Sequence, residues 1–590
     1  MKSVIHIVVD AYCYNNLLRK VGKLETTPFL NKLALESINF SNMYSQAPYT
    51  EASLVTILSG ENTLDSGGYL FGNGTTETSI FKPYKEKGYK TIFLYSPYVY
   101  SKAYLRDVDE YLYSRFYSIE NLYNYRLKYY REKYLNNKFS ENDLKVCYIL
   151  LEEGLETWLK QCNDIINATP ECDAIKGWFR DVNIYIEIKD VLVSEIEELK
   201  RNPKTYIEGV FENWDGHIIR KENKRFVKRK EIVNKSSWIK KYQEKLEGYQ
   251  SVYSNIAKKQ KIDLKYCVGM FSREKTGRIK KAKDLVKAYK DHYYNQDIKT
   301  YLTKLDEDYK NEVSFNCVLD NFYERIKKCD TTNQNYYAYI HVQDFHLPSV
   351  FHSVDNENEE LLDMEFNKAF EMLDELDSTY EGNIMADLSA RYCDYQIELF
   401  FKHLSKELKN DFVFVVTADH GYPSYDNPPR PIVYNQTYTE AFHIPCIIYD
   451  GRHSKCHEEY YSNMDVCEFI NLCSGITSQD IPESRKYILH EYGGPGCPDI
   501  SAKPIWYTYM DSEYSVSLEC SLLDSVDYDK VKSIYCLKTD FMQKFNNVKK
   551  MHYNDSIATI IQIISKRHKE LQEKYAGDKF LPSQFDKLKY

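Results

Sequence analysis

Three residues with the chemistry of metal ligands follow two apolar runs that have the composition of buried strands. Asp419 and His420 come shortly after the run 412–416, and Asp10 directly ends the run 4–9. Open α/β sheets carry their chemistry at the carboxyl ends of parallel strands. An Asp-His pair suits Zn²⁺ or Mn²⁺ better than Ca²⁺, which prefers oxygen ligands alone. The two strand ends therefore predict a metal centre.

A hydroxyl group can join this centre from the start of a predicted helix. Thr50 stands just before an apolar stretch at helical spacing that closes at Gly60, a natural helix stop. The first turn of a helix favours an anion through its N–H groups and its dipole. Cleavage of a phosphate or sulfate ester needs a nucleophile, a cation that lowers its pKa, and positive charge near the oxyanions. Taken singly, Asp10, Thr50 and Asp419 are also common turn or cap residues.

The elements that must position these residues divide the chain into four parts. Strand-like and helix-like segments alternate over 1–105 and over 335–485, which predicts an α/β catalytic domain with a mostly parallel sheet sandwiched by helices. Between them, 106–334 is poor in Gly and Pro and rich in Lys, Glu and Tyr, which favours a mostly helical insertion that caps the domain. The part 486–590 predicts a glycine-rich loop over 491–498, then a small antiparallel sheet and a terminal helix.

The composition of the 590 residues is that of an ordinary globular protein, with 43% hydrophobic and 28% charged residues. The net charge of −9 provides no basic field, so we expect no nucleic-acid partner. We also expect no membrane span, because no apolar stretch reaches the roughly 18 residues that a span needs. The 15 cysteines form no CxxC pair, and the first strand begins close to Met1 without a leader. These features favour a cytoplasmic protein and leave its oligomeric state open.

Taken together in chain order, these features resemble the sulfatase-like branch of the alkaline phosphatase superfamily. The resemblance implies an alkaline-phosphatase-like fold over roughly 1–105 and 335–550. It also implies that Asp10, Asp419 and His420 ligate a metal, and that Thr50 is a nucleophile that touches the same metal. We therefore expect one divalent cofactor, Zn²⁺ or Mn²⁺, with room for a second. The segments that carry the resemblance are 7–10, 27–33, 47–60, 88–91, 344–348, 417–421, 443–445, 465–475 and 534–547.

Three further residues are expected near the substrate. The resemblance implies that His346, in a His-x-Pro sequence, contacts the substrate or protonates the leaving group. His443 matches a position where relatives carry a basic residue or a histidine, and its alternative is a buried core histidine. Arg430 is our candidate for the cation that sulfatases carry where this chain has Leu54. His341, inside a predicted strand, is a doubtful ligand.

The nucleophile segment departs from the sulfatase pattern. Sulfatases need a Cys or Ser in a Cys-x-Pro-x-Arg frame, which maturation converts to an aldehyde, and this chain has Thr-Glu-Ala-Ser-Leu over 50–54. The second acidic residue of sulfatases is Ala11 here. Threonine cannot form that aldehyde, whereas threonine nucleophiles occur in the phosphoethanolamine and phosphoglycerol transferases and the phosphodiesterases of the superfamily. Thr50 therefore favours phosphate esters over sulfate esters.

We accordingly predict a metal-dependent phosphoric ester hydrolase or phosphotransferase that acts on a phosphodiester or phosphomonoester, either a small molecule or a glycan-linked one. One alternative is hydrolysis of a sulfuric or phosphonate ester of a glycan or metabolite on the same scaffold. Another is a catalytically degenerate binding or scaffold protein that uses the helical insertion as its interaction surface. That protein would hold no stoichiometric metal.

Overall fold

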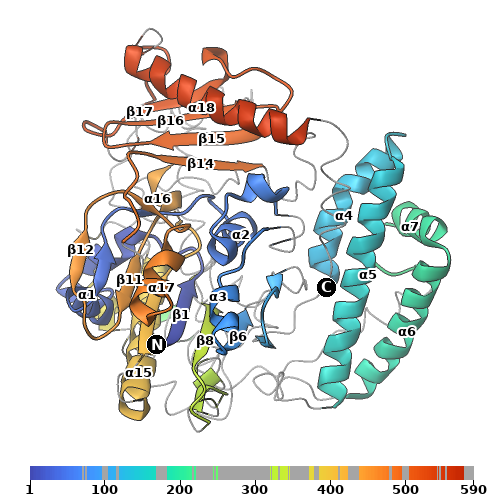
Figure 1. The fold of residues 1–590 in the computed structure, drawn as a ribbon, viewed down its shortest axis with the longest axis horizontal. Coiled ribbons are helices and arrows are strands. Elements are labelled where there is room, and N and C mark those ends of the chain that lie inside the picture. The colour runs from blue at the N-terminus through green and yellow to red at the C-terminus, as the bar shows by residue number, and fades with distance from the viewer. Residues whose placement is uncertain are drawn as a thin grey trace.

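The computed structural model describes the central α/β region, helices of the insertion and the C-terminal sheet (Figure 1). Isolated short pieces are also described within 244–249, 319–329 and 368–380. The main described residues are 1–69, 72, 76–95, 104–113, 119–167, 182–214, 218–220, 332–342, 345, 384–408, 412–422, 438–477, 481–493, 504–540, 543, 546–551 and 554–576.

An eight-stranded sheet forms the centre of the molecule, in the order β12-β4-β11-β9-β1-β8-β6-β7. β1 pairs in parallel with β9 on one side and β8 on the other, and β6 and β7 continue the parallel part, whereas β11 is antiparallel to β9. β1, β8 and β9 are buried along their whole length, which explains their apolar composition. The predicted mostly parallel sheet is confirmed. The strands are β1 (Ser3–Val9), β4 (Ile38–Phe40), β6 (Lys90–Tyr95), β7 (Glu110–Tyr113), β8 (Tyr336–Val342), β9 (Phe412–Thr417), β11 (Cys446–Tyr449) and β12 (Lys455–His457).

Helices cover both faces of this sheet. On one face, Phe401 of α15 packs against Phe412 and Phe414 of β9, and α1 packs on α15. On the opposite face, Tyr84 of α3 packs against Tyr337 of β8, and α17 lies against β1 and β9. The sheet is therefore sandwiched by helices, as predicted. These helices are α1 (Pro28–Leu35), α2 (Thr50–Ser59), α3 (Lys82–Glu86), α15 (Ile384–Glu407) and α17 (Val466–Ser474).

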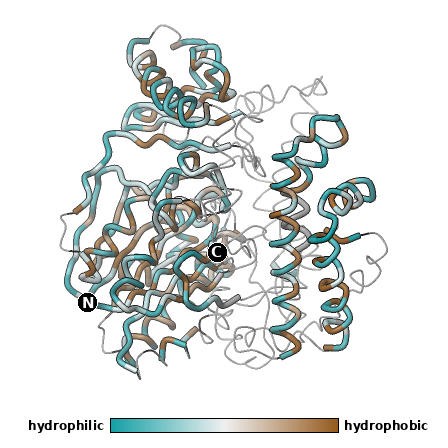
Figure 2. Tube along the Cα trace, turned by 45° about the vertical axis from the view of Figure 1, so that its right-hand side comes forward, coloured by the Kyte–Doolittle hydropathy of each residue, from teal (hydrophilic) through white to brown (hydrophobic). Residues whose placement is uncertain are grey.

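The described part of the insertion is helical and stands beside the α/β region (Figures 1 and 2). α5 packs against α4, α6 and α7, and it begins with a capping box in which Ser140 Oγ accepts the Asp143 N–H and the Asp143 carboxylate accepts the Ser140 N–H. β7 lies within the range predicted for the insertion yet pairs with the central sheet, so the sheet draws strands from beyond residue 105. The helices are α4 (Ile119–Leu135), α5 (Glu141–Ile166), α6 (Val182–Arg201) and α7 (Pro203–Glu212).

The predicted small antiparallel sheet lies near the C-terminus, in the order β14-β15-β16-β17. Ile557, Ile560 and Ile564 place one face of α18 in the hydrophobic core of this sheet. Residues 491–493, predicted as part of a loop, instead end β14 because their backbone pairs with β15; 494–498 lie outside the described residues. The elements are β14 (Ile488–Gly493), β15 (Ile505–Met510), β16 (Tyr514–Cys520), β17 (Val531–Cys536) and α18 (Asp555–Tyr575).

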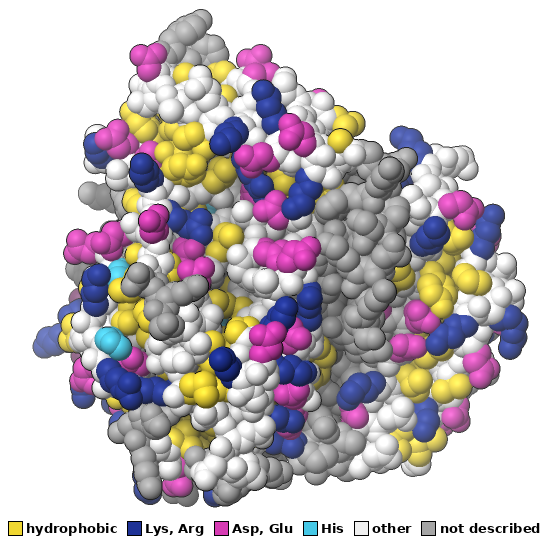
Figure 3. Space-filling model, in the orientation of Figure 1, with side chains coloured by type: hydrophobic (Ala, Val, Ile, Leu, Met, Phe, Trp, Pro, Cys, Tyr) yellow, Lys and Arg dark blue, Asp and Glu magenta, His cyan; other side chains and the backbone are white. Residues whose placement is uncertain are grey.

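Two further observations concern the charge of the surface and the apolarity of the helices. Acidic and basic side chains are interspersed over the face drawn in Figure 3, so neither sign of charge dominates that face. None of the helices in the described part of the chain has the length and apolarity that crossing a bilayer requires.

Asp394 of α15 holds the start of α1. Its two carboxylate oxygens accept the backbone N–H groups of Phe29 at 3.0 Å and Leu30 at 2.8 Å. These are donors that a first helical turn leaves without intrahelical partners. Burial raises the pKa of the Asp394 carboxyl to about 7, although the two N–H groups and Arg391 act to lower it. Asp394 therefore changes charge near neutral pH.

We expect this carboxyl to make stability fall as the pH rises from about 4 to about 7. Over that range the folded protein keeps a proton on Asp394 that the unfolded chain, with an ordinary pKa of 3.8, has lost. The free energy of unfolding then declines by up to about 1.4 kcal/mol per pH unit. Asp394→Asn removes this titration and should flatten the decline. Urea denaturation of both proteins across the range measures the difference, and parallel pH profiles would contradict it.

Candidate active site

The carboxyl ends of β1 and β9 bring three polar side chains together with the start of α2. Asp10 follows β1, Asp419 and His420 follow β9, and Thr50 is the first residue of α2. The Thr50 Oγ1 atom lies 3.5 and 3.4 Å from the two carboxylate oxygens of Asp10 and 3.3 Å from His420 Nε2. His420 Nε2 lies 3.6 Å from Asp10 Oδ1 and 3.6 Å from Asp419 Oδ2. The structure thus gathers the four side chains in one buried site.

Backbone donors hold one oxygen of Asp419 and leave the other facing the site. Asp419 Oδ1 accepts the N–H of Ala11 at 3.0 Å and that of His420 at 2.8 Å. Ala11 has a φ of 62°, an uncommon conformation for a residue with a Cβ atom, and this turn aims its N–H at Asp419. Asp419 Oδ2 is buried and has no hydrogen-bond partner among the described residues. Such an atom carries a large desolvation penalty, so it fits a metal ligand.

The other nitrogen of His420 indicates which tautomer is present. His420 Nδ1 lies 2.8 Å from the carbonyl oxygen of Gly421, which can only accept, so Nδ1 carries a proton. In the neutral ring, Nε2 then presents a lone pair to Thr50 and the two aspartates. That lone pair and the carboxylate oxygens repel each other unless a proton or a metal ion lies between them. A metal-ligating imidazole usually donates its second N–H in this way.

The Asp419 carboxyl is held in its charged form. Burial acts to raise the pKa of Asp419, but His420, His341 and the N–H groups of Ala11 and His420 outweigh it and hold that pKa below its ordinary value. Asp10, Asp419 and His420 each offer one ligand atom, and these atoms all lie within 4.8 Å of one another. Two carboxylates and an imidazole are a donor set that suits a borderline divalent metal.

Bonds from a distant segment hold the loop that leads into α2. His490 Nδ1 lies 2.7 Å from the carbonyl oxygen of Ser45, and the Tyr49 hydroxyl donates to the carbonyl of Gly493 at 2.5 Å. His490 and Gly493 both belong to β14, so the C-terminal sheet holds the loop that ends at Thr50. Neither Tyr49 nor His490 was expected at the site, because a contact between residues 444 apart leaves no local pattern in the sequence.

A comparison with known protein families matches the family described as Sulfatase over residues 2–227 and 229–475, which is most of the chain. This chain belongs to the sulfatase family. A comparison with curated proteins finds no match. The predicted superfamily is thereby confirmed, because sulfatases are metal-dependent hydrolases of the alkaline phosphatase superfamily.

Solved structures similar to this sulfatase-family chain include a phosphonate monoester hydrolase from Silicibacter pomeroyi. It is 13% identical, with a TM-score of 0.48 over 97% of this chain and 96% of that one. Another is a protein in the alkaline phosphatase superfamily from Vibrio parahaemolyticus, 12% identical, with a TM-score of 0.41 over 94% of this chain and 88% of that one. Both TM-scores are below 0.5, so the family assignment rests on the sequence match.

Within this sulfatase-family chain, His443 lies in an aromatic stack. It is the first residue of β10 (His443–Ile444), and its ring stacks between Tyr14 and Tyr44 with centroid distances of 4.4 and 4.7 Å. Its Nε2 lies 2.8 Å from the carbonyl oxygen of Ser41, and burial lowers its pKa to about 4. These contacts are those of a buried core histidine, the alternative that the sequence left open. A substrate role for His443 stays a prediction.

His346 and Arg430 lie outside the described residues, so their roles stay predictions. A residue that the sequence marked as doubtful, His341 of β8, does lie at the site. Its Nε2 atom is 3.8 Å from Asp10 Oδ2 and 3.8 Å from Asp419 Oδ2. The sequence indicated only that a histidine stands among the hydrophobic residues of a predicted strand. The pairing of β8 with β1 is what shows that this histidine faces the two aspartates.

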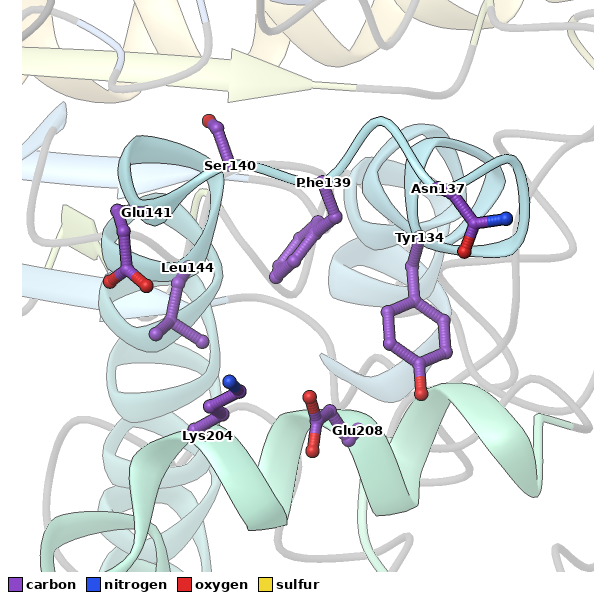
Figure 4. Close-up of a pocket in the computed structure, with 8 residues that line it drawn as sticks. All are labelled: Tyr134, Asn137, Phe139, Ser140, Glu141, Leu144, Lys204 and Glu208. Atoms are coloured by element: carbon purple, nitrogen blue, oxygen red, sulfur yellow. The ribbon is translucent and has the colours of Figure 1, made fainter.

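A cavity of about 280 Å³ lies in the insertion, between the corner that joins α4 to α5 and the start of α7 (Figure 4). Lys204 and Glu208 of α7 face Phe139 and Leu144 across it. None of the residues that line it was predicted as a site residue. The cavity also shares no lining residue with the group formed by Asp10, Thr50, Asp419 and His420.

Gly421 lets the chain pass close to α16 (Thr439–Phe442) directly after His420. Its N–H donates to the Ala441 carbonyl at 2.9 Å, and a Cβ atom at this position would overlap the carbonyl oxygen of Glu440.

We therefore expect Gly421→Ala to lower the free energy of unfolding by about 1–3 kcal/mol, because the backbone must move to admit a methyl group. Gly209→Ala in α7 is the matched control, since a Cβ atom there meets nothing within 4 Å. The control should be neutral or should raise stability by up to about 1 kcal/mol through helix propensity. Chemical denaturation compares the variants, and equal stabilities would refute the overlap.

Proposed function

We propose that this sulfatase-family protein is a metal-dependent hydrolase or transferase that cleaves phosphodiesters or phosphomonoesters with Thr50 as the nucleophile. The position of Thr50 carries the proposal. Its hydroxyl lies within 3.5 Å of Asp10 and His420, at the first turn of α2. The N-cap of α2 is Tyr49, so Thr50 is not the helix cap that was its alternative.

Asp10, Asp419 and His420, together with Thr50 Oγ1, would hold one divalent cation, Zn²⁺ or Mn²⁺. A bound cation of this kind lowers the pKa of an adjacent hydroxyl and offsets the charge of the ester. The protein's own contribution is a rigid frame. Asp419 is held by two backbone N–H groups, and His420 is oriented by the Gly421 carbonyl. Burial strengthens every electrostatic interaction in this frame because water does not screen it.

The proposed reaction has two halves. The Thr50 hydroxyl gives its proton to water, and its oxygen bonds to phosphorus while the bond from phosphorus to the leaving oxygen breaks, which produces a phosphothreonine. N–H groups of the first turn of α2 favour the negative phosphoryl oxygens, and His346 is proposed to protonate the leaving oxygen. Water or an acceptor alcohol then attacks the same phosphorus, the bond from phosphorus to the Thr50 oxygen breaks, and the proton lost by the attacking hydroxyl balances the one that Thr50 regains. The acceptor decides whether the protein is a hydrolase or a transferase.

Hydrolysis of a sulfuric or phosphonate ester is the second candidate, and the match to a family described as Sulfatase favours it. The same buried residues can serve either reaction. The nucleophile segment favours phosphate, because Thr50 cannot become the sulfatase aldehyde and Leu54 provides no cation. For either reaction we propose a small-molecule or glycan-linked ester as substrate. We also propose that the insertion, 106–334, shapes access to the catalytic parts 1–105 and 335–485.

Thr50→Ala should reduce turnover by a factor on the order of 10³ or more, because no other group replaces the nucleophile. Thr50→Ser keeps a hydroxyl at the same place and should retain measurable activity. The assay compares aryl phosphate, phosphodiester, phosphonate and sulfate esters, and mass spectrometry looks for a phosphoryl group on Thr50. Undiminished activity of Thr50→Ala would reject the mechanism, and a dominant sulfatase rate would favour the second candidate.

The purified protein should contain one equivalent of divalent metal, measured by elemental analysis. Removal with a chelator should lower the melting temperature, and Zn²⁺ or Mn²⁺ should restore it, because a ligand that binds only the folded state stabilises that state. Asp419→Asn should lose the metal. Asp450→Asn is the matched control, since Asp450 is equally buried but accepts the N–H groups of Arg452 and His453 away from the site. Absence of metal from the parent would instead support the non-catalytic scaffold.

A further inference from the structure

His341 lies directly beneath the candidate metal centre. It belongs to β8, which pairs in parallel with β1 so that His341 stands level with Val8, and the N–H of Asp10 donates to the next β8 residue, Val342, at 2.9 Å. The His341 Nε2 atom is therefore equally close to two oxygens from different strand ends, 3.8 Å from Asp10 Oδ2 and 3.8 Å from Asp419 Oδ2.

The surroundings of His341 are those of a sheet core. Its side chain is fully buried, and burial of a polar ring between sheet and helices carries a desolvation penalty that Val or Ile would not. The same face of the sheet carries two more buried polar rings, Tyr339 and His6, with centroids 5.3 Å apart. His6 Nδ1 makes a hydrogen bond of 3.0 Å with Tyr337, away from the carboxylates. Within this row, the His341 ring lies nearest the ends of β1 and β9, and its Nε2 atom is 3.8 Å from one oxygen of each aspartate.

His341 stands behind the carboxylates rather than among the atoms proposed to ligate the metal. The ligand atoms of Asp10, Asp419 and His420 form a group within 4.8 Å of one another, and His341 is not a member of that group. At 3.8 Å its contacts are longer than hydrogen bonds, so they act as electrostatic contacts. An imidazole N–H between two carboxylates offsets their mutual repulsion and limits their rotation.

We propose that His341 is a positioning residue that holds the Asp10 and Asp419 carboxylates at the spacing needed for a divalent cation. The inference rests on the proposed function, since it assumes that these aspartates bind metal. His341 takes no part in the chemical step. Its role is to pre-orient two side chains that arrive from β1 and β9 and would otherwise repel each other.

The test measures metal affinity of the folded protein by competition between apo-protein and a chromophoric chelator for Zn²⁺ or Mn²⁺. His341→Ala should weaken affinity about 10- to 100-fold, the range typical of residues that orient metal ligands. His341→Gln should restore at least part of it, because its amide N–H reaches the position of Nε2. Circular dichroism and thermal melting of the apo-proteins check that each variant is folded.

His457 provides the matched control. It is a buried histidine on β12 that stacks on Phe40 and packs against Tyr461 and Phe469, away from Asp10 and Asp419. His457→Ala should leave metal affinity unchanged, whatever it does to stability.

The outcomes separate this inference from the proposed function. A parent that binds no metal overturns both. A parent that binds metal, with a folded His341→Ala of equal affinity, overturns the role of His341 alone. Equal weakening in His341→Ala and His457→Ala, or unfolding of both His341→Ala and His341→Gln, makes His341 a core residue and also overturns the inference. Selective weakening in His341→Ala, with recovery in His341→Gln, supports it.

Discussion

Two buried carboxylates that meet around one imidazole nitrogen impose the main constraint on this protein. Asp10 and Asp419 each approach His420 Nε2 to 3.6 Å, and neither side chain is exposed. Bringing anionic groups together away from water is unfavourable unless positive charge joins them. The parallel pairing of β1 with β9 nevertheless places Asp10 and Asp419 side by side at the carboxyl ends of these two central strands. The left-handed turn at Ala11 and the close passage at Gly421 then fix their orientation.

The frame around Thr50 comes from three distant parts of the chain. α2 supplies the residue, the ends of β1 and β9 supply its neighbours, and β14 holds the preceding loop through Tyr49 and His490. The C-terminal sheet packs against α18 in a second hydrophobic cluster, while Ile488 and Tyr492 of β14 belong to the main hydrophobic core. Its contacts with the loop connect the packing of the last part of the chain to the position of the proposed nucleophile.

Membership of the sulfatase family accounts for the scaffold and for metal dependence. The reaction depends on finer features. The chain has Thr50 where the sulfatase pattern has a Cys or Ser, and Ala11 where that pattern has a second acidic residue. We propose that this difference at the start of α2 changes the reaction and leaves the architecture unchanged. That is expected where the fold positions a site and the site determines the reaction.

The sequence by itself determined the elements whose patterns are local. Buried strands show as apolar runs, α2 ends at a left-handed Gly60 as predicted, and Asp10, Thr50, Asp419 and His420 stand at element ends where chemistry is common. The tertiary structure alone decided what these residues meet. His341 faces two aspartates only because β8 pairs with β1, and His443 lies between Tyr14 and Tyr44 only because their segments pack together. The spacing of apolar residues indicates which side of one helix or strand is buried. Contacts between segments far apart in the sequence depend instead on the packing of the whole chain.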